Sequence, residues 1–182
     1  ENSGTVVGPL TIVDDGDRVD CTKLGKGGYS VPSIVEPEYI QISKCTADFV
    51  LLVEKGTQWN RLSEDKFWRR YNCILLTGNG QPPRGVRRLA RRLHEDYKLP
   101  VYVLVDNDPW GYYIYSVIKQ GSINLAFESE RMAIPKAKFI GFSSADPERY
   151  GLPRNVGIKL NDKDINRAKE LMKYKWFQKN EW

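Results

Sequence analysis

The sequence VYVLVDNDP at residues 101–109 joins an uninterrupted apolar run to two acidic residues, Asp106 and Asp108. Three other apolar runs of similar length occur at residues 49–53, 73–77 and 137–142. Uninterrupted runs of this length are typical of strands that are buried on both faces of a parallel sheet. The four runs therefore predict four strands of one buried sheet.

The segments between these runs carry signals of helices. Pro83 and Pro109 suit the first turn of a helix, and Ser63, which two acids follow, suits an N-cap. Strands that alternate with helices predict an α/β domain over residues 48–145, with a mainly parallel sheet flanked by helices.

The two ends of the chain differ from this central domain. Residues 1–47 contain short stretches of β-type composition at residues 5–7, 10–13 and 39–42, so they predict a β-rich N-terminal segment. Residues 146–182 are expected to form a C-terminal segment that contains a helix.

Acidic residues follow two of the predicted strands. Glu54 comes directly after the run at 49–53, and Asp106 and Asp108 come after the third run along the chain. Functional groups of open α/β sheets gather beyond the carboxyl ends of the strands, and residues i and i+2 of an extended segment point to the same side. Three carboxylates at one place repel one another unless a cation holds them, and a small set of hard oxygen ligands suits Mg²⁺. The sequence therefore predicts a magnesium site made by Glu54, Asp106 and Asp108.

Two other interpretations of the same residues stay open at this point. Asp-x-Asp-Pro after a strand can also be a turn with a helix cap. Phosphatases of the haloacid dehalogenase type carry Asp-x-Asp after a strand as well. In that class the motif normally follows the first strand of the core, whereas here an earlier strand ends in Glu54.

A basic helix is predicted after Pro83. Arg84, Arg87, Arg88, Arg91 and Arg92 lie close together, and apolar residues interleave them at helical spacing, so the arginines are expected to fill the polar face. Such a face is either simply solvated or contacts phosphates, for which the planar guanidinium is well suited. The net charge of +5 is compatible with a polyanionic partner. Candidates for DNA binding are Arg84, Arg87, Arg88 and Arg91.

Glu54 at the end of one strand and Asp106-x-Asp108 at the end of another form the pattern of Toprim domains. More of the chain resembles one family of Toprim proteins, the A subunits of type IIB DNA topoisomerases (topoisomerase VI), to which the meiotic double-strand-break transesterase also belongs. The resemblance includes Glu54-Lys55-Gly56, Phe67-Trp68-Arg69, Gly80-Gln81-Pro82 and the long stretch from Asp106 to Ser122.

This resemblance implies a Toprim (Rossmann-like) fold and a role in a DNA-cleaving enzyme. The enzyme would cut both strands of double-stranded DNA, pass a second duplex through the break and reseal it. Glu54 would act as a general acid/base near the leaving 3′-oxygen and as a metal ligand, and Asp106 and Asp108 would hold Mg²⁺. The implied assembly is A₂B₂, a homodimer of A subunits with B subunits that use ATP.

The family's attacking tyrosine lies on a winged-helix domain, and nothing in this sequence resembles that domain. The chain is therefore expected to be a fragment that does not cleave DNA alone. Tyr112 and Tyr113 directly follow the acidic motif and are expected to be helix residues rather than nucleophiles.

Two functions of other kinds stay open. The first is a stand-alone Toprim nuclease that uses water as its nucleophile, which metal-dependent nicking by this chain alone would favour. The second is a non-catalytic module for dimerisation and DNA docking, which an absence of Mg²⁺ binding would favour.

Composition predicts an intracellular location, in the cytoplasm or nucleoid. The longest apolar runs are too short to span a bilayer, and residues 1–20 lack the pattern of a signal peptide. The three cysteines are odd in number and none are spaced as a CxxC pair, so a disulfide framework or a zinc site is not expected.

Overall fold

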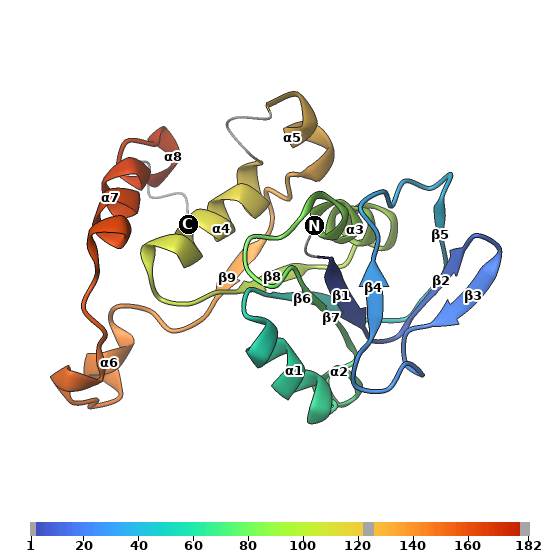
Figure 1. The fold of residues 1–182 in the computed structure, drawn as a ribbon, viewed down its shortest axis with the longest axis horizontal. Helices are drawn as coiled ribbons and strands as arrows, with labels where there is room; N and C mark the ends of the chain where they lie inside the picture. Colours follow the sequence, from blue (N-terminus) through green and yellow to red (C-terminus); the bar gives the residue numbers. More distant parts are fainter. Residues whose placement is uncertain (1–2, 122–125, 179–182) are drawn as a thin grey trace.

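The computed structural model of the chain describes residues 3–121 and 126–178. Figure 1 shows a central sheet with helices on both faces and a smaller sheet at one end. The strands are β1 (Gly4–Val7), β2 (Leu10–Asp14), β3 (Asp17–Asp20), β4 (Tyr29–Val31), β5 (Ile40–Cys45), β6 (Phe49–Val53), β7 (Cys73–Thr77), β8 (Val101–Leu104) and β9 (Lys138–Ile140). The helices are α1 (Gly56–Glu64), α2 (Phe67–Arg70), α3 (Arg84–Tyr97), α4 (Pro109–Gln120), α5 (Ala126–Met132), α6 (Asp146–Arg149), the 3₁₀ helix η2 (Arg154–Val156), α7 (Asp162–Leu171) and α8 (Lys175–Gln178).

The central sheet has six strands in the order β4-β1-β7-β6-β8-β9. β6 pairs in parallel with β7 and β8, and β8 pairs in parallel with β9. β1 and β4 extend the sheet on the β7 side in antiparallel orientation. This arrangement confirms the predicted α/β class with a mainly parallel sheet, and each of the four apolar runs supplies one of its strands.

The N-terminal segment contributes to both sheets. β2, β3 and β5 form a separate antiparallel sheet, whereas β1 and β4 belong to the central one. The predicted β-rich character of residues 1–47 is therefore confirmed. The division of the chain at residues 47 and 145 stays a prediction, because β1 joins the same sheet as strands that follow the first boundary.

The position of β6 between two cores explains why its sequence is apolar without interruption. Val50 and Leu52 belong to a large core that α3 and α4 cover, whereas Leu51 and Val53 belong to a second core on the opposite face, under α1 and α2. Successive residues of a strand point to opposite faces, so helices on both faces require an apolar side chain at every position.

The prediction of a helix that begins at Ser63 is wrong. α1 begins at Gly56, directly after the Glu54-Lys55 turn, and Ser63 is a buried residue near its end. The Ser63 hydroxyl donates to the Lys26 carbonyl instead of capping a helix. The chain turns at Lys66, whose φ of 52° lies in the left-handed region, and a separate short helix, α2, follows. The helix starts expected at Pro83 and Pro109 agree with the structure, in which α3 begins at Arg84 and α4 at Pro109.

The C-terminal helix α7 packs against α4. Its Arg167 guanidinium lies 4.4 Å from the ring centroids of both Trp110 and Tyr113, which are on α4. The indole N–H of Trp110 also donates to Asp164 at 3.2 Å. Cation–π contact with two rings is a specific attachment, so these contacts fix α7 against the first turns of α4. Among the residues that the structure describes, no helix is long and apolar enough to cross a membrane.

Candidate metal centre

The ends of β6 and β8 bring Glu54 and Asp106 together. The two strands are parallel neighbours, so the residues that follow them leave the sheet at the same edge. The Glu54 amide donates to the Leu104 carbonyl at 2.9 Å, and the Asp106 amide donates to Glu54 Oε2 at 2.9 Å. The Glu54 carboxylate is therefore held against the backbone at the start of the Asp106-Asn107-Asp108 turn.

Asp106 is held by two side chains at the start of α1. Lys55 Nζ lies 2.5 Å from Asp106 Oδ2, and Gln58 Nε2 donates to Asp106 Oδ1 at 3.4 Å. Lys55 is the N-cap residue of α1, and Gln58 is three residues further on, so both project from the same side of the helix. The Lys55 side chain is 57% exposed and that of Asp106 27%, so this ion pair lies at the surface of the site.

Asp108 has a structural role in addition to its charge. It is the N-cap of α4, and its Oδ1 accepts from the Gly111 amide at 2.7 Å. Gly111 lies so close to the acidic turn that a Cβ atom there would be 2.1 Å from the Asp106 carbonyl oxygen. Asp-x-Asp-Pro is therefore a turn with a helix cap and can still be part of a metal site. The Asp108 carboxylate caps α4, and the Asp106 carboxylate lies beside it.

The electrostatics of the site reflect three neighbouring carboxylates and one ammonium. Burial raises the pKa of Glu54, and the negative charges of Asp106 and Asp108 raise it further, whereas the hydrogen bond from the Asp106 amide lowers it. The hydrogen bond and charge of Asp106 raise the pKa of Lys55, and the charges of Glu54 and Asp108 act in the same direction. The Lys55 ammonium therefore interacts with all three acids.

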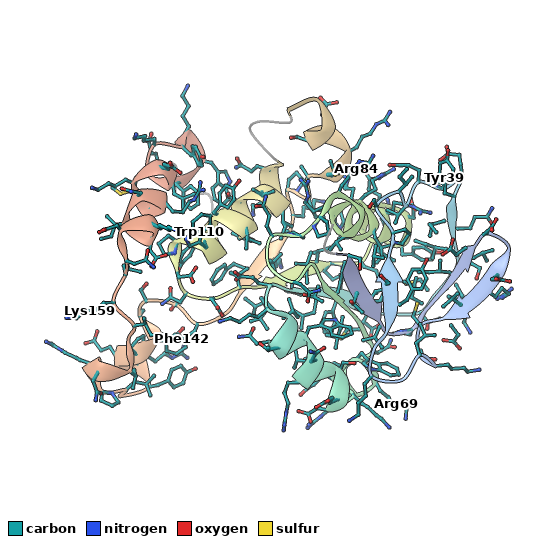
Figure 2. All side chains as sticks on the ribbon, viewed as in Figure 1. Tyr39, Arg69, Arg84, Trp110, Phe142 and Lys159 are labelled. Atoms are coloured by element: carbon teal, nitrogen blue, oxygen red, sulfur yellow. The ribbon has the colours of Figure 1, made fainter. Side chains whose placement is uncertain are left out.

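A cleft of about 780 Å³ opens beside these residues. One wall comes from α1, with Lys55, Gln58 and Arg61, and the floor comes from the acidic turn. The opposite wall comes from Phe142 and from the segment that leads into α7, including Lys159; Figure 2 labels both. An apolar cavity of about 920 Å³ adjoins it along α4 and α7 and shares Asn107 and Asp108 with the cleft. Asp106 and Asp108 thus border an open cleft.

The three carboxylates fit a divalent cation by their chemistry, since they are hard oxygen donors on adjoining strand ends. Within residues 3–121 and 126–178, however, no three acidic, cysteine or histidine side chains are grouped so that they could hold an ion as they stand. Each carboxylate already has a partner in the protein: Glu54 accepts from a backbone amide, Asp106 from Lys55, and Asp108 from Gly111. Binding of a cation to all three therefore requires these side chains to approach one another, and the Lys55 ammonium is already paired with Asp106.

The arginines of α3 lie outside this cleft, and simple solvation, one of the two interpretations of their face, does not describe them. Arg84 and Arg88 both bond to the Glu36 carboxylate, Arg91 pairs with Glu95 and donates to the Ala133 carbonyl, and Arg87 is buried. For Arg84 and Arg88 the acceptor comes from the loop between β4 and β5, whereas Arg91 bonds to Glu95 of its own helix and to the Ala133 carbonyl. Contact with DNA through Arg84, Arg87, Arg88 and Arg91 stays a prediction.

Arg92 completes this buried arrangement. It is 5% exposed, and its Nη1 donates to the Val35 carbonyl at 2.5 Å and to the Ile40 carbonyl at 2.7 Å. Burial lowers the pKa of this guanidinium. The predicted basic helix is therefore, in large part, a means of attaching the residue 35–40 segment to the core.

Sequence reasoning missed Lys55, Gln58 and Arg61, the side chains of α1 that line the cleft. They were missed because the start of α1 was not recognised. The N-cap composition at Ser63 predicts a helix that begins after these residues, whereas α1 begins before them, at Gly56. Helical spacing would have placed Gln58 on the same side of α1 as Lys55, with Arg61 one turn further along. Tyr112 and Tyr113 are residues of α4, as predicted, and the Tyr112 hydroxyl donates to Asn107 Oδ1 at 3.0 Å.

An α/β sheet that presents a glutamate at one strand end and Asp-x-Asp at the adjoining one defines a Toprim-type domain. Comparison with known families agrees. The family of Toprim domains from Spo11 and the A subunit of topoisomerase 6 matches residues 49–182, and the family "All-beta domain in DNA topoisomerase VI alpha subunit" matches residues 1–46. The chain therefore belongs to the family of Spo11 and the topoisomerase 6 A subunits.

Similar proteins come from archaea and plants. The chain is 46% identical to the A subunit of type 2 DNA topoisomerase 6 from Aeropyrum pernix over 99% of its length, and 44% identical to that of Pyrococcus horikoshii over 100%. It is 37% identical to the A subunit of DNA topoisomerase 6 from Arabidopsis thaliana over 97% of its length. The matched regions cover 48%, 50% and 41% of these three proteins, so the chain spans about half the length of these relatives or less.

Proposed function

We propose that the chain is the metal-binding part of the DNA-cleaving A subunit of an ATP-dependent type IIB topoisomerase. The observation that supports this most is the junction of β6 and β8, where Glu54 accepts from the Asp106 amide beside Asp108 and an open cleft. Membership of the family of Spo11 and the topoisomerase 6 A subunits supports it independently.

In this proposal Asp106 and Asp108 hold Mg²⁺ and Glu54 assists as a ligand. A bound Mg²⁺ polarises a phosphate oxygen and offsets the charge that develops on the leaving group. The protein groups supply position: the backbone hydrogen bond fixes Glu54, and the α4 N-terminus fixes Asp108. The acids lie at the carboxyl edge of the sheet, where substrates of open α/β folds bind.

The proposed reaction is transesterification. The phenolic oxygen of a tyrosine from a domain outside this chain attacks the phosphorus and releases its proton to water, and the bond from phosphorus to the 3′-oxygen breaks. Glu54 donates a proton to that 3′-oxygen. When the 3′-hydroxyl attacks the phosphotyrosine to reseal the strand, Glu54 takes the proton back and the tyrosine oxygen regains one from water. Burial raises the pKa of Glu54, which favours its protonated form when no cation is bound to it.

The proposed partners follow from this reaction. A second A subunit supplies the attacking tyrosine, B subunits use ATP to drive passage of a second duplex, and double-stranded DNA is the substrate. Such a complex acts inside the cell, at the nucleoid. The described tyrosines nearest the acids, Tyr112 and Tyr113, are engaged with Asn107 and Arg167, so neither is proposed as the nucleophile.

Calorimetric titration with Mg²⁺ tests the metal site. The double variant Asp106→Asn/Asp108→Asn should lose Mg²⁺ binding and keep its circular dichroism spectrum. Asp17→Asn, in the β2–β3 hairpin, removes an acid of the other sheet and should bind like wild type. Equal binding by the double variant and wild type would refute the metal centre.

Plasmid assays test whether the chain needs a tyrosine from another domain to cleave DNA. Supercoiled plasmid incubated with the chain, Mg²⁺ and ATP should stay supercoiled, because strand breakage needs a nucleophile in line with the phosphate and the proposed tyrosine lies on another domain. In the complete A₂B₂ enzyme, Glu54→Ala should abolish cleavage. Mg²⁺-dependent nicking by the chain alone, lost in Glu54→Ala, would instead establish a nuclease that uses water.

One observation favours a second candidate, a non-catalytic docking module. Lys55 neutralises Asp106 within the protein, as expected for acids that no longer bind a metal. In that case wild type would show no measurable Mg²⁺ binding, and the complete enzyme would be insensitive to the change at Glu54.

A further inference from the structure

Lys55 lies at the centre of the acidic site, and its position is fixed by the fold. It follows Glu54 directly, occupies the N-cap position of α1, and its Nζ lies 2.5 Å from Asp106 Oδ2. The N–H groups of the first turn of a helix carry partial positive charge, so α1 and the Lys55 ammonium together offset the acids from one side. Lys55 thus occupies the place of a counter-ion to Asp106.

This counter-ion is not locked in place. The Lys55 side chain is 57% exposed, whereas the arginines that clamp α3 are largely buried, and an exposed ion pair of this kind is weak. Lysine has a long flexible stem, so its ammonium can reach a new partner while the backbone stays fixed. The ion pair can therefore be exchanged at small cost.

The cleft offers Lys55 a second kind of partner. Lys55, Arg61 and Lys159 line the same space as Asp106, so the acids are bordered by cations on two walls. A nucleic acid that enters this cleft brings phosphate oxygens, and an ammonium is a strong point charge for phosphate. The arginines of α3, by contrast, are outside the cleft and bonded to protein acceptors.

We propose that Lys55 is an exchangeable counter-ion: it holds Asp106 while the site is empty, and it transfers to a phosphate of the DNA when a divalent cation binds Asp106. This inference rests on the proposed function, since it needs both a metal and a polyanion at the site. It assigns to Lys55 the coupling between metal binding and DNA binding.

The proposal predicts effects of opposite sign from one substitution. Lys55→Met removes the competing ammonium, so Mn²⁺ and Mg²⁺ should bind roughly two- to fivefold more tightly, as expected for loss of an exposed ion pair. The same variant should bind duplex DNA more weakly in Mg²⁺. Loss of one phosphate contact should flatten the slope of log K against log salt by about 0.9. If Lys55 only stabilised the fold, its removal would not strengthen metal binding and weaken DNA binding at the same time.

The test measures Mn²⁺ binding by electron paramagnetic resonance and DNA binding by fluorescence anisotropy of a labelled duplex at several salt concentrations. Arg61→Met is the matched control for metal binding, since it removes one cation from the same helix and cleft wall but from a side chain paired with Asp65. Its effect on Mn²⁺ affinity should be smaller than that of Lys55→Met. Lys55→Arg keeps a cation and should restore the salt slope.

Each outcome decides the proposal. Tighter Mn²⁺ binding with a flatter DNA slope in Lys55→Met supports it. Mn²⁺ affinity that is unchanged, reduced, or raised no more than in Arg61→Met overturns it, and so does an unchanged salt slope. Thermal unfolding of each variant shows whether a loss of binding comes from a loss of fold. Failure of the proposed function is distinguishable, because Asp106→Asn would then bind Mn²⁺ no differently from wild type.

Discussion

Replacement of Glu36 by glutamine tests whether the arginines of α3 serve the fold. The Glu36 carboxylate accepts from Arg84 Nη2 at 3.1 Å and from Arg88 Nε at 3.0 Å, and it lies 3.0 Å from Arg88 Nη2. The side chains of Glu36 and Arg88 are 20% and 14% exposed, so water screens this pair only partly. Glu36→Gln keeps the shape and one acceptor oxygen, but it turns an amide NH₂ group toward guanidinium donors.

The expected loss follows from the hydrogen bonds. A hydrogen bond to a charged group contributes about 1.5–3 kcal/mol, and the glutamine retains part of the set. We expect the free energy of unfolding to fall by about 2–3 kcal/mol, which lowers the Tm of a chain of this size by roughly 5–10 °C. Urea unfolding at neutral pH, followed by circular dichroism, measures this loss. Glu38→Gln, at an exposed position of the same loop, is the matched control and should change little.

The pH dependence gives an independent check. The hydrogen bond from Arg88, with help from Arg84, holds the pKa of Glu36 below its ordinary value. A depressed carboxyl pKa stabilises the fold above the unfolded-state pKa, and the gain is lost as pH falls through the folded-state pKa. The difference between wild type and Glu36→Gln should therefore shrink at acidic pH. A loss below about 0.5 kcal/mol at neutral pH, small even for an ordinary hydrogen bond, would refute the view that these arginines clamp the loop.

Four further outcomes are expected. If Arg84, Arg87, Arg88 and Arg91 each neutralise one DNA phosphate, log K should fall with log salt at a slope of about −3.6, and Arg87→Ala/Arg88→Ala/Arg91→Ala should flatten it; an unchanged slope would leave these residues a purely structural role. Gly111→Ala should cost about 1–3 kcal/mol and weaken Mg²⁺ binding, because the new methyl group meets the Asp106 carbonyl, whereas Gly157→Ala, with its nearest neighbour at 3.8 Å, should be close to neutral. Glu54→Gln should raise the Tm at neutral pH and not at acidic pH. Burial raises the pKa of Glu54, so the charged carboxylate opposes folding once the pH rises through that pKa, and glutamine removes this charge. A lower Tm of the variant at neutral pH would contradict this. Arg167→Ala should release α7 from α4, seen as faster thermolysin cleavage of the C-terminal segment at an almost unchanged Tm, and Lys169→Ala, exposed on the same helix, should be cleaved like wild type.

The sequence predicted the sheet and the order of its functional groups because both depend on local signals. Apolar runs such as 49–53 and 101–105 identify strands with two buried faces, and Glu54 and Asp106 follow those runs directly. Parallel pairing then brings them to one edge. The roles of Asp106 and Asp108 as Mg²⁺ ligands, and of Glu54 as an acid/base, stay predictions.

The errors concern contacts between segments that are distant in the chain. Ser63 has the composition of an N-cap, but it is a buried residue near the end of α1, which begins at Gly56, and its hydroxyl donates to the distant Lys26 carbonyl. The arginines of α3 have the spacing of a polar face, but the loop that holds Glu36 folds over them. Neither fact is encoded in the residues of the helix itself, since each depends on which distant segment supplies the neighbour.

The antiparallel pairing of β1 with β7 affects how the protein can be divided and how it folds. β7 is buried along its whole length, and its outer edge is covered by residues from the start of the chain, with Val6 opposite Leu76. A polypeptide that began at residue 48 would expose this apolar strand as a free edge, and such edges recruit strands from other molecules into aggregates. During synthesis β1 emerges first and must wait for a distant partner, a pairing that slows folding. Expression of the Toprim region therefore calls for retention of residues 4–7, even though they belong by sequence to the neighbouring all-β domain.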